Sequence, residues 1–545
     1  MSNALEQASL IMVPSGYEDG TLGSLKPTDG TGDFTFSRGS NTSATRVNAD
    51  GYIEKGYENL LLQSNSFTTS PWSSIDITLT GGQEGYDGSS NAWKAQFNSG
   101  FRYIGQNISS SGINTFSVYA KAGTTEWIRL SPFGTSPSQG AYFNIALDGS
   151  GSVGYSFGGV ETNIDYISNG WYRCSITIKE SFTSVNIIGS DAGGSTSTSG
   201  EYCYIQDAML NQGLVAYPYL ETTDSPVQGG LLENSPRLDW SNGVPSVLVE
   251  EGRTNLVRNS EALNISPNVV ESVSYSYNEI ASPSGFINAP KFSETTEGTA
   301  YRHGFYHYVV IPNGAITASI FTKQIDRRYV SLQSNATGSN QYSYVDLQDG
   351  SVVSEGTGWT LSTEDYGNGW WRIIATATGI QSSPYFIWGM SINGTSNTYS
   401  GDGSEFTFWG VQLEEGSYPT SYIPTCGTTQ TRSKEVISDN FNIPTTATIY
   451  NSFYSDVAET VFVFDQVFNV VEGLNKVAIA FSPTAVKISV GGSIVANATG
   501  TYDTTSLTNI QLGSNNGTDY SNAPISGFYV FPEFLTDAEL NSLTD

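Results

Sequence analysis

The chain has 545 residues, of which 52 are acidic and 23 are basic, so its formal net charge at neutral pH is −29. A protein that binds nucleic acid needs a positive surface to displace counterions from phosphates. This charge excludes nucleic acid and an anionic membrane as partners. No apolar run is long enough to cross a bilayer, and the first residues lack the pattern of a signal peptide. If the protein ends up outside a cell, we expect something other than a secretion signal to take it there.

The composition favours β structure. The chain contains 58 Gly, 32 Tyr and 26 Phe residues, and such residues are typical of strands and turns. Cys174, Cys203 and Cys426 are odd in number and form no Cys-x-x-Cys motif, which argues against a disulfide framework or a zinc site. At about 100–200 residues per domain, the length predicts about three domains. We predict an all-β protein of tandem antiparallel β-sandwich (jelly-roll) domains.

Two segments look like extended lead-ins to the domains that follow them. The first, which we call lead-in one, is 1–58, with strand-like stretches at 33–38 and 44–54 after a loop rich in Gly, Pro, Asp and Thr. The second, which we call lead-in two, is 223–254, with strand-like stretches at 237–240 and 245–250. We predict that their strands lie across neighbouring domains and that the first segment attaches the chain to its partners.

We predict that residues 59–222, called copy one, and residues 255–432, called copy two, are two copies of one fold. Five motifs recur at an offset of about 200 residues, which indicates a domain duplication and not a solenoid. The pairs are 59–64 with 255–260, 116–121 with 318–323, 148–149 with 349–350, 169–173 with 368–372, and 210–222 with 413–425.

Inside each copy the motifs predict strands and turns. Residues 116–120 alternate large and small side chains, as a half-buried strand does, and Asp148-Gly149 predicts a hairpin turn. A tryptophan and an arginine follow an Asn-Gly turn at the same place in both copies. We interpret these residues as structural anchors of the repeat and not as sugar platforms; they are Trp171, Arg173, Trp370 and Arg372.

Residues 433–545 form a third unit. Strands are predicted at 461–464, 476–481, 486–490, 493–495, 510–513 and 527–531. Thr536 or Asp537 can cap a short C-terminal helix. Leu540 and Leu543 are expected on its buried face.

The lead-in stretches Asp33–Glu54 and Arg237–Leu256 resemble a segment common in predicted structural proteins of bacteriophages. The stretch Trp409–Gly416, with Tyr422–Thr425, resembles the closing strand of the associated carbohydrate-binding-like jelly rolls. The C-terminal unit is similar to concanavalin/laminin-G-like sandwiches. Copy one departs from this pattern: Asn211-Gln212 replaces Glu414-Glu415, and Tyr217-Pro218 replaces Thr420-Ser421. This departure weakens the expectation of a ligand in copy one.

Candidate catalytic groups are few. His303 and His307 are the only histidines, so any Ser-His-Asp or Cys-His arrangement needs one of them. Their spacing places both on one face of a strand, and we expect them at the surface or rim. A two-histidine metal site is the alternative, but no third ligand is evident. Ser156 lies in a Gly-x-Ser-x-Gly pattern that leads into no helix. We expect no enzymatic activity, no metal and no cofactor.

Two kinds of ligand stay open as alternatives. Asp19, Asp29 and Asp402, each followed by glycine, offer oxygen ligands of the kind that Ca²⁺ prefers, although no EF-hand spacing is present. Sugar binding needs an aromatic platform flanked by amides or carboxylates. The candidates are Trp72, Trp93, Trp127, and Tyr520 with Asn515 and Asn516. Ordinary packing is the competing interpretation of each.

These features favour a structural surface protein of a phage virion, a head fibre or capsid decoration, whose modules adhere to host or environmental glycans. Its N-terminal region is expected to contact other virion proteins, and a homotrimer is expected by analogy with fibres. We expect the protein on the virion surface, made in the host bacterial cytoplasm and released by lysis. One alternative is a receptor-binding tail fibre that recognises cell-surface polysaccharide. A second is a polysaccharide depolymerase that uses paired carboxylates.

Overall fold

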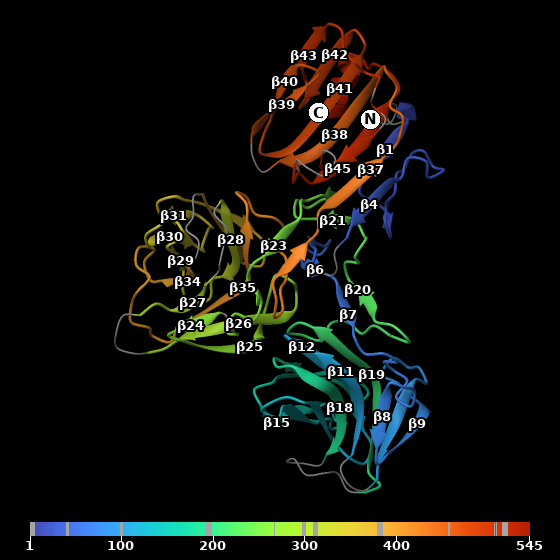
Figure 1. Ribbon diagram of the computed structural model, residues 1–545, viewed down its shortest axis with the longest axis vertical. Coiled ribbons are helices and arrows are strands. Elements are labelled where there is room, and N and C mark those ends of the chain that lie inside the picture. The colour runs from blue at the N-terminus through green and yellow to red at the C-terminus, as the bar shows by residue number, and fades with distance from the viewer. Residues whose placement is uncertain are drawn as a thin grey trace.

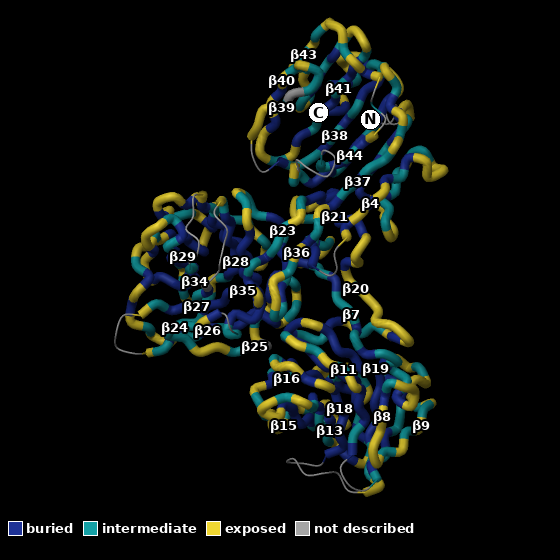
Figure 2. Tube along the Cα trace, viewed as in Figure 1, coloured by how far each residue is buried: buried dark blue, intermediate teal, exposed yellow. Residues whose placement is uncertain are grey.

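A computed structural model describes residues 6–39, 43–98, 102–190, 199–265, 268–296, 301–308, 314–378, 385–455, 458–505, 507, 509–514 and 521–545. Every strand pairing in it is antiparallel, which confirms the predicted all-β class. The chain folds into three lobes that meet at a crossing of extended segments (Figure 1). Buried residues form the interior of each lobe and also occur at the crossing (Figure 2). Among the described residues, no helix is long and apolar enough to span a membrane.

Copy one is a sandwich of two six-stranded sheets, in the orders β16-β17-β12-β19-β10-β9 and β15-β14-β13-β18-β11-β8. Its core lies between the sheets and includes Phe97, Phe116 and Ile176. The strands are β8 (Trp72–Ile75), β9 (Ile77–Gln83), β10 (Ala92–Phe97), β11 (Tyr103–Ser110), β12 (Asn114–Ala122), β13 (Trp127–Phe133), β14 (Gly140–Asn144), β15 (Ser152–Phe157), β16 (Glu161–Ser168), β17 (Trp171–Ile178), β18 (Phe182–Ser190) and β19 (Tyr202–Gln212).

Copy two repeats this topology strand for strand, in the orders β32-β33-β28-β35-β26-β25 and β31-β30-β29-β34-β27-β24. The shared strand order is the structural signature of the duplication. The strands are β24 (Val269–Glu271), β25 (Val273–Ala281), β26 (Ile287–Glu294), β27 (Gly304–Tyr308), β28 (Ile316–Lys323), β29 (Tyr329–Ser334), β30 (Gln341–Asp346), β31 (Val352–Ser354), β32 (Trp359–Asp365), β33 (Trp370–Ala377), β34 (Tyr385–Ser391) and β35 (Glu405–Glu415).

The turns of the repeat follow the sequence motifs, but the burial of its central strand does not. Asn169 and Gly170 have φ values of 49° and 79°, as a two-residue hairpin turn requires, and they connect β16 to β17. By contrast, the half-buried strand predicted at 116–120 is wrong. Every residue from Asn114 to Ala120 is buried, because other parts of the chain cover the outer face of β12.

The C-terminal unit is not built from residues 433–545 alone. Strands of both lead-ins complete its two sheets, of orders β21-β22-β45-β38-β41-β42-β43 and β2-β3-β4-β37-β44, with β1 added beside β45. The lead-in strands are β1 (Leu10–Met12), β2 (Tyr17–Glu18), β3 (Thr21–Leu22), β4 (Phe34–Arg38), β5 (Thr45–Val47), β6 (Ile53–Lys55), β7 (Tyr57–Asn59), β20 (Val227–Gly229), β21 (Arg237–Asp239), β22 (Ser246–Leu248) and β23 (Arg253–Asn255).

The predicted C-terminal helix is confirmed. Thr536 and Glu539 form a reciprocal capping box at its start, and Leu540 and Leu543 pack against the outer face of the larger sheet. The remaining elements are β36 (Gln430–Arg432), β37 (Glu435–Asp439), β38 (Ala447–Ser455), β39 (Glu459–Val463), β40 (Gln466–Val470), β41 (Gly473–Ser482), β42 (Ala485–Val490), β43 (Ser493–Thr499), β44 (Ile510–Leu512), β45 (Ile525–Phe531) and α2 (Asp537–Thr544).

Five charged side chains meet at the crossing, and we call them the ionic junction. Arg38 comes from β4, Arg237 from β21, Arg432 from β36 and Glu435 from β37, whereas Glu250 follows β22. None of the five is more than 4% exposed. The two lead-ins and the start of the C-terminal unit therefore share one buried cluster.

Arg237 is the centre of the ionic junction. Its Nε donates to Glu435 Oε1 at 2.8 Å, and its Nη2 donates to Glu250 Oε2 at 2.8 Å and to Glu435 Oε2. Arg38 Nη1 lies 2.8 Å from Glu435 Oε1, and Arg432 Nη1 lies 2.8 Å from Glu250 Oε2. Burial alone would raise the pKa of Glu250, but Arg432 and Arg237 lower it to about 2. Both carboxylates therefore stay charged and paired at neutral pH.

Replacing Glu435 with Gln should lower the free energy of unfolding by about 3–5 kcal/mol, because Arg38 and Arg237 would keep buried charges without their carboxylate. Urea unfolding followed by tryptophan fluorescence measures the loss. The control is Glu533→Gln, which changes an exposed side chain and should shift stability by less than about 0.5 kcal/mol. Equal effects of the two substitutions would contradict a structural role of the ionic junction.

Candidate functional site

The asparagine that opens each copy fastens the chain to the closing strand. Asn255 Nδ2 donates to the carbonyls of Val411 (3.2 Å) and Ile423 (2.9 Å). Its Oδ1 accepts the N–H groups of Val257 and Leu413, both at 3.1 Å. All four hydrogen-bonding positions of the amide are thus satisfied in the interior. In copy one, Asn59 makes the equivalent four bonds, with Ala208, Leu220, Leu61 and Leu210.

A serine five residues later fixes the segment after the closing strand, 213–222 in copy one and 416–425 in copy two, which we call the closing segment. Ser260 Oγ is 2.6 Å from Tyr422 Oη, and it accepts the N–H of Thr425 at 2.8 Å. Copy one has the same contacts, from Ser64 to Tyr219 and Thr222. The motifs at both ends of each copy therefore bind each other.

Arg173 and Arg372 hold the same closing segments from the other side. Arg372 Nη2 donates to the carbonyl of Thr420 at 2.7 Å and to Ser319 Oγ at 3.2 Å. Arg173 Nη2 donates to the carbonyl of Tyr217 at 2.5 Å and to Ser117 Oγ at 3.2 Å. The structure thus engages both arginines in internal contacts.

The exchange of Asn211 for Glu414 keeps this arrangement. Glu414 accepts the N–H of Thr420 at 2.9 Å and its hydroxyl at 2.7 Å. Asn211 Oδ1 accepts the N–H of Tyr217, and its Nδ2 donates to the carbonyl of Val215. Both residues fold the closing segment back on its strand.

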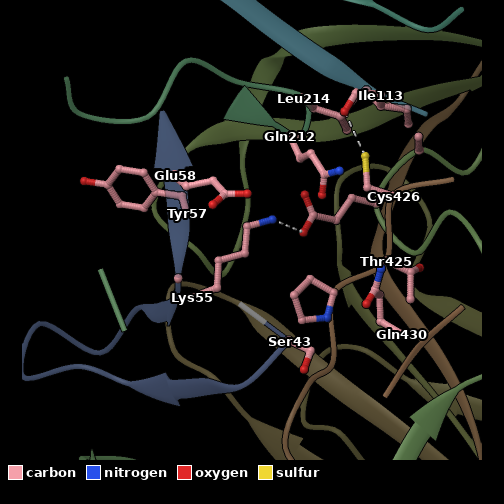
Figure 3. A pocket seen from close by; sticks show the side chains of 15 residues that line it. Ser43, Lys55, Tyr57, Glu58, Ile113, Gln212, Leu214, Thr425, Cys426 and Gln430 are labelled. Carbon is pink, nitrogen blue, oxygen red and sulfur yellow. Dashed lines mark hydrogen bonds and ion pairs between the residues drawn. The ribbon is translucent and has the colours of Figure 1, made fainter. Parts of the chain in front are cut away.

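The closing segments line a site between the two copies, where β6 and β7 pass between them (Figure 3). Its centre is an ion pair between Lys55 Nζ and Glu261 Oε1, 3.0 Å apart, of which Lys55 is from β6 and Glu261 from copy two. A cavity of about 70 Å³ lies on one side of the pair. A second cavity of about 280 Å³ lies on the other side. We call this region the inter-copy site.

Aromatic rings and hydrogen bonds hold the ion pair in place. Lys55 Nζ lies 5.4 Å from the ring centre of Tyr217, which stacks on Tyr57 at 4.8 Å. Glu261 also accepts Asn288 Nδ2 at 3.3 Å and the hydroxyl of Tyr422 at 3.4 Å. Burial would lower the pKa of Lys55, but the carboxylate of Glu261 raises it above its ordinary value. The pair therefore joins lead-in one, copy one and copy two in a fixed geometry.

Burial shifts two titratable groups beside the smaller cavity towards their protonated forms. Glu58 points into the smaller cavity (Figure 3), and burial raises the pKa of its carboxyl. Cys426 Sγ donates to the carbonyl of Ile113 at 3.0 Å, and burial raises its pKa to about 11. At neutral pH the thiol is protonated and is not a nucleophile.

The predicted sugar-binding tryptophans do not lie together. Trp72 is 6% exposed and packs on Phe67 with ring centres 5.0 Å apart. Trp93 Nε1 donates to the carbonyl of Asn65, and its ring also faces Phe67. These two rings belong to the core of copy one, so neither is an open platform. Asn515, Asn516 and Tyr520 lie outside the described residues.

Trp127 is half-buried and lies on the outer face of its sheet, against Gly154. The neighbouring Tyr155 is 65% exposed and stacks on Phe157 at 6.0 Å. Arg129 lies 4.9 Å from the ring centre of Phe157. This outer face of copy one is the part of the predicted set that is open to solvent. The anchors Trp171 and Trp370 are 1% and 3% exposed.

The prediction that the histidines lie at the surface is wrong. His303 and His307 are each 1% exposed. His303 lies between the carbonyls of Ser272 and Tyr399, at 2.9 and 3.1 Å. His307 stacks on Phe386 at 5.5 Å, and within the described part of the chain neither of its ring nitrogens has a hydrogen-bond partner. The strand that carries the histidines points both imidazole rings into copy two, where they pack against the rings of Tyr399 and Phe386.

Two of the three loops considered for calcium use their carboxylates internally, whereas Asp19 is exposed. Asp29 accepts the hydroxyl of Thr31 at 2.7 Å, and Asp402 is paired with Arg327 at 2.8 Å. Within the part of the chain that the structure describes, no group of three or more His, Cys, Asp and Glu side chains could hold a metal ion.

The ion pair of the inter-copy site should be coupled across the copies. Lys55→Met should lower the free energy of unfolding by about 3 kcal/mol, because Glu261 would stay buried and unpaired. The double variant Lys55→Met/Glu261→Gln should recover at least half of that loss in urea unfolding. The control is Lys487→Met, whose partner Asp537 is exposed, with an expected cost below about 1 kcal/mol. Additive single effects would contradict coupling of the pair.

His307 should make stability depend on pH. Burial lowers its pKa to about 4 from 6.5, so the folded state keeps the neutral ring while the unfolded chain takes up a proton. The stability that comes from keeping this ring neutral is fully present above pH 6.5. It is lost as the pH falls from 6.5 through 4, and the loss amounts to about 3 kcal/mol of unfolding free energy. Urea unfolding of the wild type and of His307→Leu at pH 7 and pH 4 measures this difference. A constant difference between the two proteins would overturn the assignment.

No protein-family model matches the sequence, and a search of curated proteins finds no match.

Proposed function

We propose that the chain is a non-enzymatic structural protein on the surface of a bacteriophage particle, of the head fibre or capsid decoration kind. The observation that carries this proposal is the way in which the N-terminal lead-in completes the C-terminal sandwich and the ionic junction. Lead-in one is thereby fixed to the C-terminal unit, and its Lys55 contacts Tyr217 of copy one and Glu261 of copy two. A protein that projects from a particle needs this kind of fixed geometry.

Two further features agree with a structural role. The net charge of −29 keeps crowded copies apart by repulsion. The reactive groups considered from the sequence are also used for packing: both histidines and the thiols of Cys174 and Cys203 are buried. The likeness of the lead-ins to segments of phage structural proteins supplies the link to a virion.

A receptor-binding tail fibre is the second candidate. The observation that favours it is the outer face of copy one, where Trp127, Arg129, Tyr155 and Phe157 form an open aromatic surface. Aromatic rings of this kind stack on sugar rings.

Cryo-electron microscopy of purified particles, with mass spectrometry of their proteins, tests the proposal. We expect the chain among the particle proteins and its three-lobed density on the capsid. Density at the tail tip would support the receptor-binding fibre instead. Absence of the chain from particles would overturn both virion functions.

A further inference from the structure

A further cavity borders the ionic junction and shares Thr45, Ile53 and Tyr422 with the wall of the inter-copy site. It is a cavity of about 390 Å³, which we call the junction cavity. Its walls come from the β5–β6 hairpin, from the turn 240–242 after β21, from residues 364–366 at the end of β32, and from residues 522 and 524 before β45. Both lead-ins, copy two and the C-terminal unit therefore contribute to one space.

Two aromatic residues line the junction cavity, one with its backbone tied to lead-in one and one with its ring packed on copy two. The backbone N–H of Trp240 donates to the carbonyl of Val47 at 2.9 Å. Asp239, next to it, accepts the N–H of Val47 at 2.7 Å, so the turn is tied to lead-in one. Tyr366 packs edge-on against Phe321, with ring centres 4.8 Å apart. Trp240 and Tyr366 are both half-buried, so each ring is partly accessible.

Polar groups suited to hydroxyls surround these rings. Asp365 is exposed and accepts the N–H of Gly367 through Oδ1, which leaves its Oδ2 for a ligand. Asn242 is exposed as well, and an amide both donates and accepts. Asn522 Oδ1 is buried and has no hydrogen-bond partner among the described residues. A ring that carries several hydroxyl groups satisfies such a set better than an apolar ligand does.

The charges of the walls select against other ligands. The carboxylates of Asp239, Glu250, Glu364 and Asp365 outnumber the guanidinium groups of Arg46 and Arg372. Both arginines are already used, Arg46 by Glu54 and Arg372 by the closing segment. Glu250 and Glu364 are paired with arginines, but the exposed carboxylate of Asp365 disfavours an anionic ligand. A metal ion has no set of three ligating side chains among the described residues.

We propose that the junction cavity binds a neutral saccharide, with one sugar ring on Trp240 and hydroxyl groups on Asp365 and Asn242. The cavity volume lies within the range of about 300–1,000 Å³ that is usual for small-ligand sites. The site exists only when the lead-ins, copy two and the C-terminal unit are assembled. Sugar binding at this place is independent of where the protein sits on a particle.

Saturation-transfer NMR on the full chain tests this inference. The probes are glucose, galactose, N-acetylglucosamine, maltose, lactose and cellobiose, with glucuronic acid as the anionic comparison. We expect at least one neutral sugar to bind and glucuronic acid not to bind. Trp240→Ala and Asp365→Asn should each weaken binding at least tenfold. Tyr155→Ala, an equally accessible aromatic change on copy one, should leave binding unchanged.

Thermal unfolding of each variant shows whether the fold is retained, and Asp365→Asn alters an exposed side chain of the same shape, so it tests the site even where Trp240→Ala unfolds. Silence of the whole neutral panel would overturn the inference. Binding that survives Asp365→Asn but is lost in Tyr155→Ala would also overturn it, and would place sugar binding on the outer face of copy one. Neither result bears on the location of the chain in particles.

Discussion

The buried pairing of Arg237 with Glu435 and Glu250 is the interaction on which the arrangement of the units depends. These groups come from lead-in two and from the start of the C-terminal unit, and Arg38 brings in lead-in one. Removing charges from water is costly, and the pairs offset that cost only when every partner is in place. A cluster of this kind does little for stability compared with an apolar core of the same volume. It is specific, because a lead-in that is out of register would leave an arginine unpaired in the interior.

The duplicated sandwiches show how one fold can serve two surroundings. In copy two, Ile53 of lead-in one inserts among Phe321, Trp370 and Trp409 on the outer face of the sheet. In copy one the corresponding face, with Trp171, is covered by a residue of its own chain segment, Tyr86, which stacks on Tyr119 at 4.0 Å. Copy one thus closes over itself, whereas copy two uses the lead-in as part of its surface. This difference explains why the ionic junction and the junction cavity involve copy two and the C-terminal unit, but not copy one.

The class of fold, the duplication and the C-terminal helix could be predicted from the sequence because they depend on local patterns: strand periodicity, Asn-Gly turns and a capping box. The junctions could not. Lys55 and Glu261 are 206 positions apart, and no spacing rule connects a lysine of a lead-in with a glutamate of the second copy. The histidines were misplaced for a related reason. A run of aromatic residues with polar members is typical of the rim of a sandwich. Only the structure shows that the ring of His307 stacks on Phe386 inside copy two. A usable signal was present in the low charged content of 14%, because an arginine or glutamate inside an extended stretch such as 237–250 is then conspicuous.

The same constraint connects the assembly to what the surface can recognise. The junction cavity borders the ionic junction, since Glu250 and the closing residue Ser421 line the cavity and also bind each other. The hydroxyl oxygen of Ser421 also accepts hydrogen bonds from Nη1 of Arg237 at 2.7 Å and from Nη1 of Arg432 at 2.8 Å. The cavity wall is therefore fixed by the charges that fix the lobes. A ligand that binds there gains a preorganised site and stabilises the assembled state by a free energy that grows with the logarithm of the ligand concentration above Kd. Recognition at this place would thus report that the lead-ins, copy two and the C-terminal unit are correctly joined, which no single sandwich could do.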